Sequence, residues 1–147
     1  MAQLQEQLLN ESNRAGFVDD CVGVVEAEVA SKSGMGGLVI KTAFKTVKAV
    51  KPGIIPDVVN VLLDDFVEQL EPFYETYQNS GSGDIRGFLV KDANAVANAL
   101  LAITDRRAER SRHKTLVKAY NKLRPQGQKQ VVTAMPRIGD MLAARGL

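Results

Sequence analysis

The side chains that most often perform chemistry in proteins are scarce in this chain of 147 residues. It contains one histidine, His113, and one cysteine, Cys21. Zinc sites of the common kind need several His or Cys ligands, so one copy of the chain cannot build such a site. A single cysteine also excludes an intrachain disulfide. The sequence therefore predicts no catalytic residue, no metal site and no cofactor.

Neither Cys21 nor His113 is expected to act in catalysis. Cys21 falls on the apolar stripe of a helix, where cysteines behave as small hydrophobic groups. The neighbouring carboxylates of Asp19 and Asp20 are expected to raise the pKa of its thiol. His113 lies in a basic run, residues 110–114, whose charge favours the neutral imidazole. We interpret it as incidental.

Two other patterns resemble ligand sites. Four acids spaced four, three and four apart share one helix face, namely Asp64, Glu68, Glu71 and Glu75. One helix face cannot surround a cation, so we expect a solvated acidic surface. Residues 34–42, GMGGLVIKT, resemble a phosphate-binding loop, but Ile40 stands where such a loop has a glycine before its lysine. We expect these glycines to form a turn between helices.

Charge is sorted along the chain into blocks of alternating sign. Residues 1–30 and residues 57–75 carry six acids each, whereas residues 31–56 carry five lysines and no acid. Residues 106–147 carry eleven bases and two acids, although the net charge of the whole chain is only +2. Such blocks indicate electrostatic partners, either in the same chain or in another molecule.

The basic blocks hold the side chains best suited to contact a polyanion. Three lysines spaced four and three apart form one stripe on a helix expected over residues 37–50. Further along, four bases fall on one face if the chain is continuously helical from residue 107 to residue 118. The candidate polyanion-binding residues are Lys41, Lys45, Lys48, Arg106, Arg107, Arg110, Lys114 and Lys118.

Three interpretations of these bases stay open. In the first, acidic and basic helices pack as neighbours, and their pairing selects one order of the bundle. In the second, the basic helices bind nucleic acid, although a pI of about 8.7 is below the range typical of such domains. In the third, they contact an acidic protein. A membrane surface is not expected, because the apolar face of helix 37–50 is needed for the core.

Apolar residues recur at helical spacing along nearly the whole chain, which predicts an all-α fold. We expect a single helical domain over residues 1–147, a bundle of about five to seven helices. Asn79-Ser80-Gly81-Ser82-Gly83 is the clearest loop. The expected helices cover residues 2–9, 12–31, 37–50, 56–72, 85–103 and 113–123, with a short last segment opening at Met135-Pro136. Pro72 is expected to kink or end its helix, although the apolar pattern continues through Phe73 and Tyr77.

Several short motifs are spread from the second helix to the end of the chain. They are Ala27-Glu28-Val29, Lys32-Ser33-Gly34, Lys48-Ala49-Val50-Lys51-Pro52-Gly53, Leu100-Leu101-Ala102-Ile103-Thr104-Asp105, Ala119-Tyr120, Leu123-Arg124-Pro125 and Pro136-Arg137-Ile138-Gly139. In these motifs the chain resembles a family of small, uncharacterised bacterial helical proteins. The resemblance implies one intact helical domain, and it assigns no activity and no site residues.

Together these features predict a non-catalytic, cytoplasmic protein that acts through self-association or through a macromolecular partner. The first residues lack the pattern of a signal peptide, and no apolar run approaches the ~20 residues of a membrane span. We expect self-association to use an alanine-rich helix and the amphipathic segment 135–147. The alternative is a nucleic-acid-binding protein without sequence preference. An enzyme with a carboxylate in a pocket ranks third.

Overall fold

The computed structural model describes residues 3–147, and within that range the chain forms helices and no strand. The predicted all-α fold is confirmed: seven helices, α2 to α8, form a bundle, and the short α1 closes one end. A 3₁₀ turn, η1 (Arg124–Gln126), precedes the last helix. The α-helices are α1 (Gln3–Leu8), α2 (Arg14–Ser31), α3 (Gly34–Lys48), α4 (Ile54–Asn79), α5 (Ile85–Lys91), α6 (Ala93–Arg110), α7 (Lys114–Leu123) and α8 (Gly127–Ala144).

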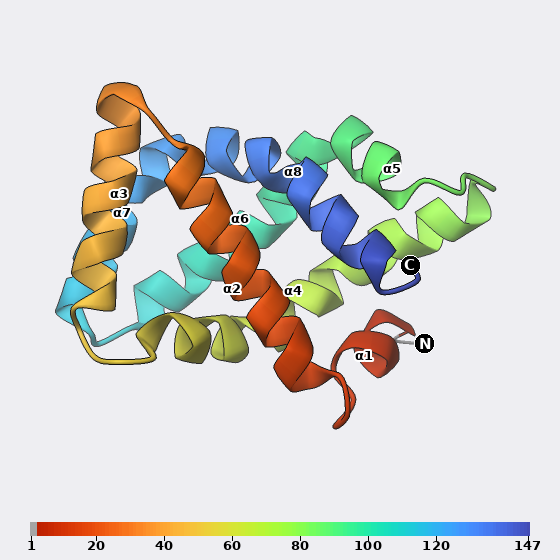
Figure 1. The fold of residues 1–147 in the computed structure, drawn as a ribbon, viewed down its shortest axis with the longest axis horizontal. Coiled ribbons are helices and arrows are strands. Elements are labelled where there is room, and N and C mark those ends of the chain that lie inside the picture. Colours follow the sequence, from red (N-terminus) through yellow and green to blue (C-terminus); the bar gives the residue numbers. More distant parts are fainter. Residues whose placement is uncertain (1–2) are drawn as a thin grey trace.

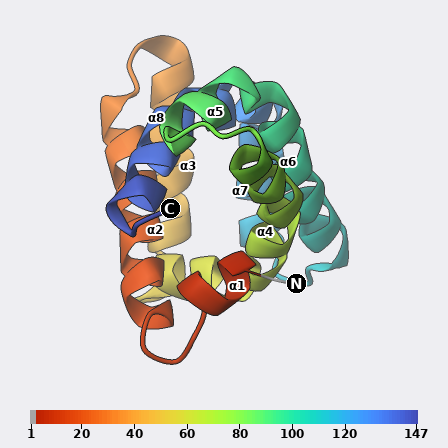
Figure 2. The same ribbon diagram turned by 90° about the vertical axis from the view of Figure 1, so that its right-hand side faces the viewer.

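Two pairs of helices form the body of the molecule. Figure 2 shows α2 and α8 on one side and α4 and α6 on the other, with α5 along one edge and α1 along the opposite edge. The strongest packing contacts join α5 to α8, α3 to α7, and α6 to both α8 and α4. In Figure 1, α3 and α7 stand together at one end of the molecule, far from α1 and the C-terminus.

The main hydrophobic core draws on six helices and on neither α3 nor α7. Leu4 and Leu8 of α1 enter it together with Phe17 of α2, as their helical spacing predicts. Residues of α4, α5, α6 and α8 complete it, among them Leu63, Val67, Leu89, Val96, Met135 and Leu142. The helices α3 and α7 bury only a few small or branched side chains in contacts of their own, including Ala43 and Ala119.

The glycine-rich segment forms the first turns of α3, and the predicted turn over residues 36–37 is wrong. The helix begins at Gly34, whose φ of 71° lies in the left-handed region that favours glycine. Gly37 is buried against the backbone of Lys32, where a Cβ atom would come within 2.8 Å of the carbonyl carbon. The glycines therefore allow α3 to begin with only two residues between it and the end of α2.

The long helix predicted from residue 85 to residue 103 is interrupted at Asp92. This residue has φ −97° and ψ 19°, so it ends α5 and begins α6. The break lets α5 lie along α8 while α6 packs on α4. Gly139 of α8 makes this contact close, because a Cβ atom there would lie 2.6 Å from the Cα atom of Arg86.

Two prolines stand inside helices, and for Pro72 this is the continuation that the apolar pattern through Tyr77 indicates. Pro72 lies inside α4, which continues to Asn79, and Pro136 lies inside α8, which begins at Gly127 instead of Met135. Burial of Tyr74 and Tyr77 beyond the first proline, and of Leu142 beyond the second, holds both helices past the missing hydrogen bond.

Two helix starts also differ from the predicted positions. Helix α2 starts at Arg14 with Asn13 as its N-cap residue, not at Ser12, because the side chain of Asn10 accepts a hydrogen bond from the Asn13 N–H and organises the preceding turn. Helix α4 starts two residues before Pro56, after a left-handed Gly53. The predicted start of the first helix, residue 2, lies outside the described residues.

Candidate functional site

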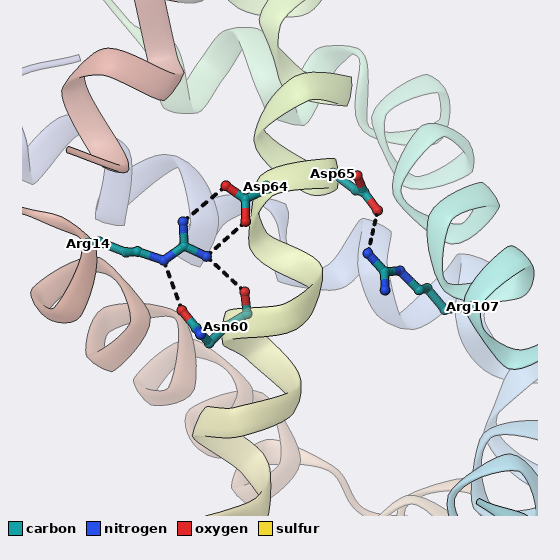
Figure 3. A network of polar contacts seen from close by, with 5 residues as sticks. All are labelled: Arg14, Asn60, Asp64, Asp65 and Arg107. Carbon is teal, nitrogen blue, oxygen red and sulfur yellow. Dashed lines mark hydrogen bonds and ion pairs between the residues drawn. The ribbon is translucent and has the colours of Figure 1, made fainter. Parts of the chain in front are cut away.

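Two arginines on neighbouring helices hold α4 from opposite sides (Figure 3). Arg14 of α2 donates to both carboxylate oxygens of Asp64, at 3.0 and 2.9 Å, and also to the side chain and the carbonyl of Asn60. Arg107 of α6 donates to Asp65 at 2.9 Å. The hydrogen bond from Arg14 lowers the pKa of Asp64 below its usual range. Through these contacts the acidic residues of α4 bind α2 on one side and α6 on the other.

Two acids of α2, Asp20 and Glu28, are paired in the same way with arginines in α8 or directly after it. Arg145 lies 2.7 Å from Asp20, and Arg137 donates to Glu28. Ion pairs thus join α2 with α8 and α4 with α6, as the first interpretation of the charge blocks expects, and selection of the bundle order by these pairs stays a prediction. Pairing between helices accounts for the arginines of the chain better than for its lysines, most of which do not take part in these contacts.

The candidate polyanion-binding residues separate into one paired base and seven unpaired ones. Only Arg107 has an ion pair within residues 3–147. The seven bases without one in that range are Lys41, Lys45, Lys48, Arg106, Arg110, Lys114 and Lys118. Because α3 packs against α7, and α7 follows α6 directly, the structure gathers all seven at one end of the molecule (Figure 1).

The shared helix face predicted for the downstream bases does not exist. Residues 111–113 are not helical, so Arg107 and Arg110 end α6 while Lys114 and Lys118 belong to α7. His113 has a structural role that the sequence did not reveal. Its Nδ1 accepts a hydrogen bond from the Leu116 N–H at 3.4 Å and caps α7.

An apolar groove of about 770 Å³ lies between the helices at this same end. The N-terminal half of α4, the C-terminal part of α6 and one face of α7 line it, and α3 contributes Val47. Its arginines, Arg106, Arg107 and Arg110, come from the last turns of α6. The apolar floor includes Ile54, Val58, Leu62, Leu116 and Leu123.

A polar network fixes the wall of the groove where α6 meets α7. The Tyr120 hydroxyl donates to Asp105 and lies 2.7 Å from the Thr104 hydroxyl. Arg124 donates to both oxygens of Asp105, at 2.7 and 3.1 Å. The Arg124 bond, followed by that from Tyr120, lowers the pKa of Asp105, whereas burial raises the pKa of Tyr120. Asp105 is thus ionised and Tyr120 protonated at neutral pH, a pairing suited to holding two helices together.

The groove has no direct signature in the sequence, because two separate stretches of the chain, α3 with α4 and α6 with α7, come together to build it. One signal was present. Apolar positions cover more of α4 than one face requires: Leu63 and Val67 enter the core, while Val58, Val61 and Leu62 line the groove. An apolar surface wider than about 100° on one helix indicates a second contact.

The other candidates from the sequence have structural roles. Cys21 packs against Met141, and burial, together with the charge of Asp20, raises the pKa of its thiol to about 12. Glu71 accepts the backbone N–H of Leu4 at 2.8 Å and so caps α1. Throughout the described chain no group of three or more His, Cys, Asp or Glu side chains is placed to hold a metal ion.

Surface hydrophobicity also differs from the sequence-based expectation. The segment 135–147 was expected to be left uncovered, yet Met135 and Leu142 are fully buried in the core. The large exposed apolar residues include Met35, Leu38 and Val39 of α3 and Val61 at the groove. From residue 3 onward, none of the helices has both the length and the apolar character needed to cross a bilayer.

Comparison with known proteins places the chain in one family. A protein-family model described as a family of unknown function (DUF6918) matches residues 4–145. Neither the curated proteins nor the solved structures contain a match to the chain. The resemblance to an uncharacterised family is confirmed by this match, and the bacterial origin stays a prediction.

Proposed function

The chain belongs to this family of unknown function, and we propose that it is a non-catalytic binding protein whose groove takes an acidic, amphipathic helix of a partner protein. The observation that carries this proposal is the groove itself, which combines an apolar floor with unpaired arginines at its edge. A helix with apolar side chains on one face and acids beside them has the complementary chemistry.

The shape of the groove favours a helix over a compact ligand. Val61 lies on its edge with 55% of its surface exposed, next to the half-buried Val58 and Leu62. A ligand that filled only the interior would leave Val61 in contact with water. A helix lying along α4 would cover it, with side chains at i, i+3 or i+4, and i+7 reaching the floor.

Charge at the groove favours an acidic partner. Asp65 is neutralised by Arg107, and Asp57 is paired with Lys51 at 3.0 Å. Arg106 and Arg110 have no ion pair in the described range. Unpaired charge of one sign beside an apolar floor accelerates encounter with an acidic partner and fixes its orientation.

A designed peptide tests the proposal. We would measure anisotropy of a labelled 18-residue helix with leucines at i, i+3, i+4 and i+7 and glutamates elsewhere, against a version with lysines in place of the glutamates. The acidic peptide is expected to bind and the basic one to fail. Val61→Asp and the double change Arg106→Glu, Arg110→Glu should each weaken binding by about tenfold or more.

Matched controls come from the opposite end of the molecule. Val90→Asp changes an exposed valine of α5, and Lys91→Glu reverses a base with no ion pair among residues 3–147. Both variants should bind the acidic peptide like the unaltered protein. Equal loss in the controls, or binding of a fatty acid in place of the peptide, would contradict the proposal. A dimer in sedimentation that Val61→Asp dissociates would identify the partner as a second copy.

A second candidate function, nucleic-acid binding without sequence preference, is favoured by the gathering of the unpaired bases of α3 and α7 at one end. Anisotropy with labelled duplex and single-stranded DNA at about 50 and 200 mM salt tests it, since phosphate contacts make affinity fall steeply with salt. Charge reversal at Lys41 and Lys45 should then weaken binding for every base sequence. Unchanged affinity in that variant would remove α3 from the nucleic-acid site.

A further inference from the structure

Helix α3 carries a second apolar face that nothing in the described chain covers. Met35 is 82% exposed, Leu38 60% and Val39 40%, and their spacing of three and four residues places them side by side. The side of the helix that packs against the protein buries Gly37, Ile40 and Ala43. The three exposed residues therefore do not belong to the face by which α3 packs against the rest of the molecule.

Lysines follow this exposed face along the helix. Lys41, Lys45 and Lys48 are exposed and form no ion pair within residues 3–147. The whole stretch 31–56 lacks an acid, so no negative side chain of α3 opposes them. An exposed apolar patch with a purely positive flank is the pattern of helices that lie in the interface of an anionic membrane.

We propose that α3 is a membrane-contacting helix, which inserts Met35, Leu38 and Val39 among the lipids of an anionic bilayer while its lysines bind the headgroups. The position of α3 suits this contact, since it stands at one end of the molecule and outside the main core (Figure 1). At this position α3 can contact a flat bilayer surface while it stays packed against the neighbouring helices.

Charge and hydrophobicity together favour a bilayer over other occupants of this face. In a dimer formed through α3, the lysine stripe would meet the same stripe of a second copy, with no acid of α3 to neutralise it. A nucleic acid would match the lysines but would set phosphates against Met35 and Leu38. An anionic bilayer offers both negative headgroups and an apolar interior.

The expectation that membrane contact is absent assumed that α3 has a single apolar face, which the core occupies. The structure divides the apolar residues of α3 between two faces, and only one of them packs against the protein. The membrane proposal uses the outer face and does not involve the groove. A groove variant such as Val61→Asp should therefore leave membrane binding unchanged, which makes failure of the two proposals distinguishable.

Vesicle co-sedimentation provides the first test. At low salt the full chain is expected to bind vesicles that contain both phosphatidylcholine and phosphatidylserine. It is expected not to bind vesicles that contain only phosphatidylcholine. The double change Lys41→Glu, Lys45→Glu should lower the partition coefficient by at least about 25-fold, since each lysine near such a surface contributes about a fivefold factor. The double change Met35→Ser, Leu38→Ser should lower it by about tenfold or more.

Matched variants elsewhere separate this effect from general loss of charge or hydrophobicity. Lys91→Glu with Lys129→Glu, and Val61→Ser with Val90→Ser, should bind vesicles like the unaltered chain. Circular dichroism checks that every variant is folded. Absence of binding to anionic vesicles at about 50 mM salt would overturn the proposal, as would equal losses in the matched variants.

A fluorescence experiment reports insertion directly, because the chain contains no tryptophan. Leu38→Trp should show a blue shift of its emission on addition of anionic vesicles, while Val90→Trp should show none. A Leu38→Trp emission that stays unshifted while the protein sediments with vesicles would mean purely electrostatic adsorption and would overturn insertion. Binding of α3 to DNA but not to vesicles would assign its lysines to a nucleic acid instead.

Discussion

The two ends of this molecule are built differently although one helix, α4, runs through both. At one end, α1, α5, α8 and the C-terminal half of α4 supply much of the buried core. At the other end, α3 and α7 stay outside that core and enclose, with α4 and α6, an apolar groove. The first end accounts for folding. The second leaves apolar surface and charge unsatisfied, which is the condition for binding another molecule.

The bases of the chain follow the same division. Arginines at helix ends join one helix to the next: Arg14, the first residue of α2, joins it to α4, and Arg145, just after α8, joins α8 to α2. Lysines of α3 and α7 have no ion pair in the part of the chain that the structure describes. Some basic side chains thus join helices through ion pairs, and others stay unpaired on the surface. Only the position of an acidic partner in the fold distinguishes the two groups.

Two methionines sharpen this comparison most strongly. Met135→Ala should lower the free energy of unfolding by about 3 kcal/mol, because Met135 is fully buried in the core and its loss leaves a cavity. Met35→Ala, at a side chain that is 82% exposed, should change it by less than about 0.5 kcal/mol. Urea denaturation followed by circular dichroism measures both. Similar losses in the two variants would mean that α3 shares the core after all.

Two glycines give the next largest difference. Gly139→Ala should destabilise the protein by about 1–3 kcal/mol, since the new Cβ atom would lie 2.6 Å from the Cα atom of Arg86 and force α5 away from α8. Gly23→Ala, in the middle of α2 with no heavy atom within 4 Å, should stabilise it by about 0.5–1 kcal/mol. Thermal unfolding distinguishes the opposite signs. A neutral Gly139→Ala variant would contradict the close contact of α5 with α8.

The smallest expected effect concerns the ion pair of Arg14 with Asp64. Asp64→Asn should cost less than about 1 kcal/mol at pH 7, because both side chains are partly exposed. Arg14 lowers the pKa of Asp64, so the folded state favours the ionised carboxylate and gains stability above the ordinary pKa of 3.8. That gain disappears as the pH falls through the lowered pKa.

Urea denaturation at pH 7 and near pH 3 therefore checks the Asp64 pair. The difference between the unaltered protein and Asp64→Asn should shrink at the lower pH. Glu75→Gln is the control for removal of a carboxylate from the same helix, because Glu75 forms no ion pair within residues 3–147, and at pH 7 it should change the free energy of unfolding by less than about 0.5 kcal/mol. A difference for Asp64→Asn that grows at low pH would rule out the pair as its cause.

The fold class could be predicted because helical spacing of apolar residues is a local signal. Leu4, Leu8 and Phe17 are buried as their spacing indicates. The ends of helices were less accessible, since they depend on contacts made far away. The break at Asp92 follows from the packing of α5 on α8, and the passage of α8 through Pro136 follows from burial of residues on both sides of it. The sequence around Asp92 or Pro136 alone does not indicate these contacts, because their partners lie in other parts of the chain.

The basic residues of the candidate site could be predicted from the sequence, but the apolar groove could not. The lysine stripe of α3 and the candidate bases between residues 106 and 118 were identified from the sequence, and the structure gathers them at one end. The prediction could not separate Arg107, whose partner Asp65 lies 42 residues earlier, from its unpaired neighbours. It also could not assemble a groove from four helices. Both failures concern which residues meet across the fold.

The place of α3 and α7 outside the core has a consequence for the motions of the protein. These two helices can separate from the body without exposing the main hydrophobic cluster, so their opening requires less free energy than global unfolding. Their backbone amides should accordingly exchange with solvent sooner than those of α4 or α8. A partner held across this end would suppress that opening. Its binding would then be recorded as slower exchange confined to α3 and α7, while the amides of the other helices exchange as in the free protein.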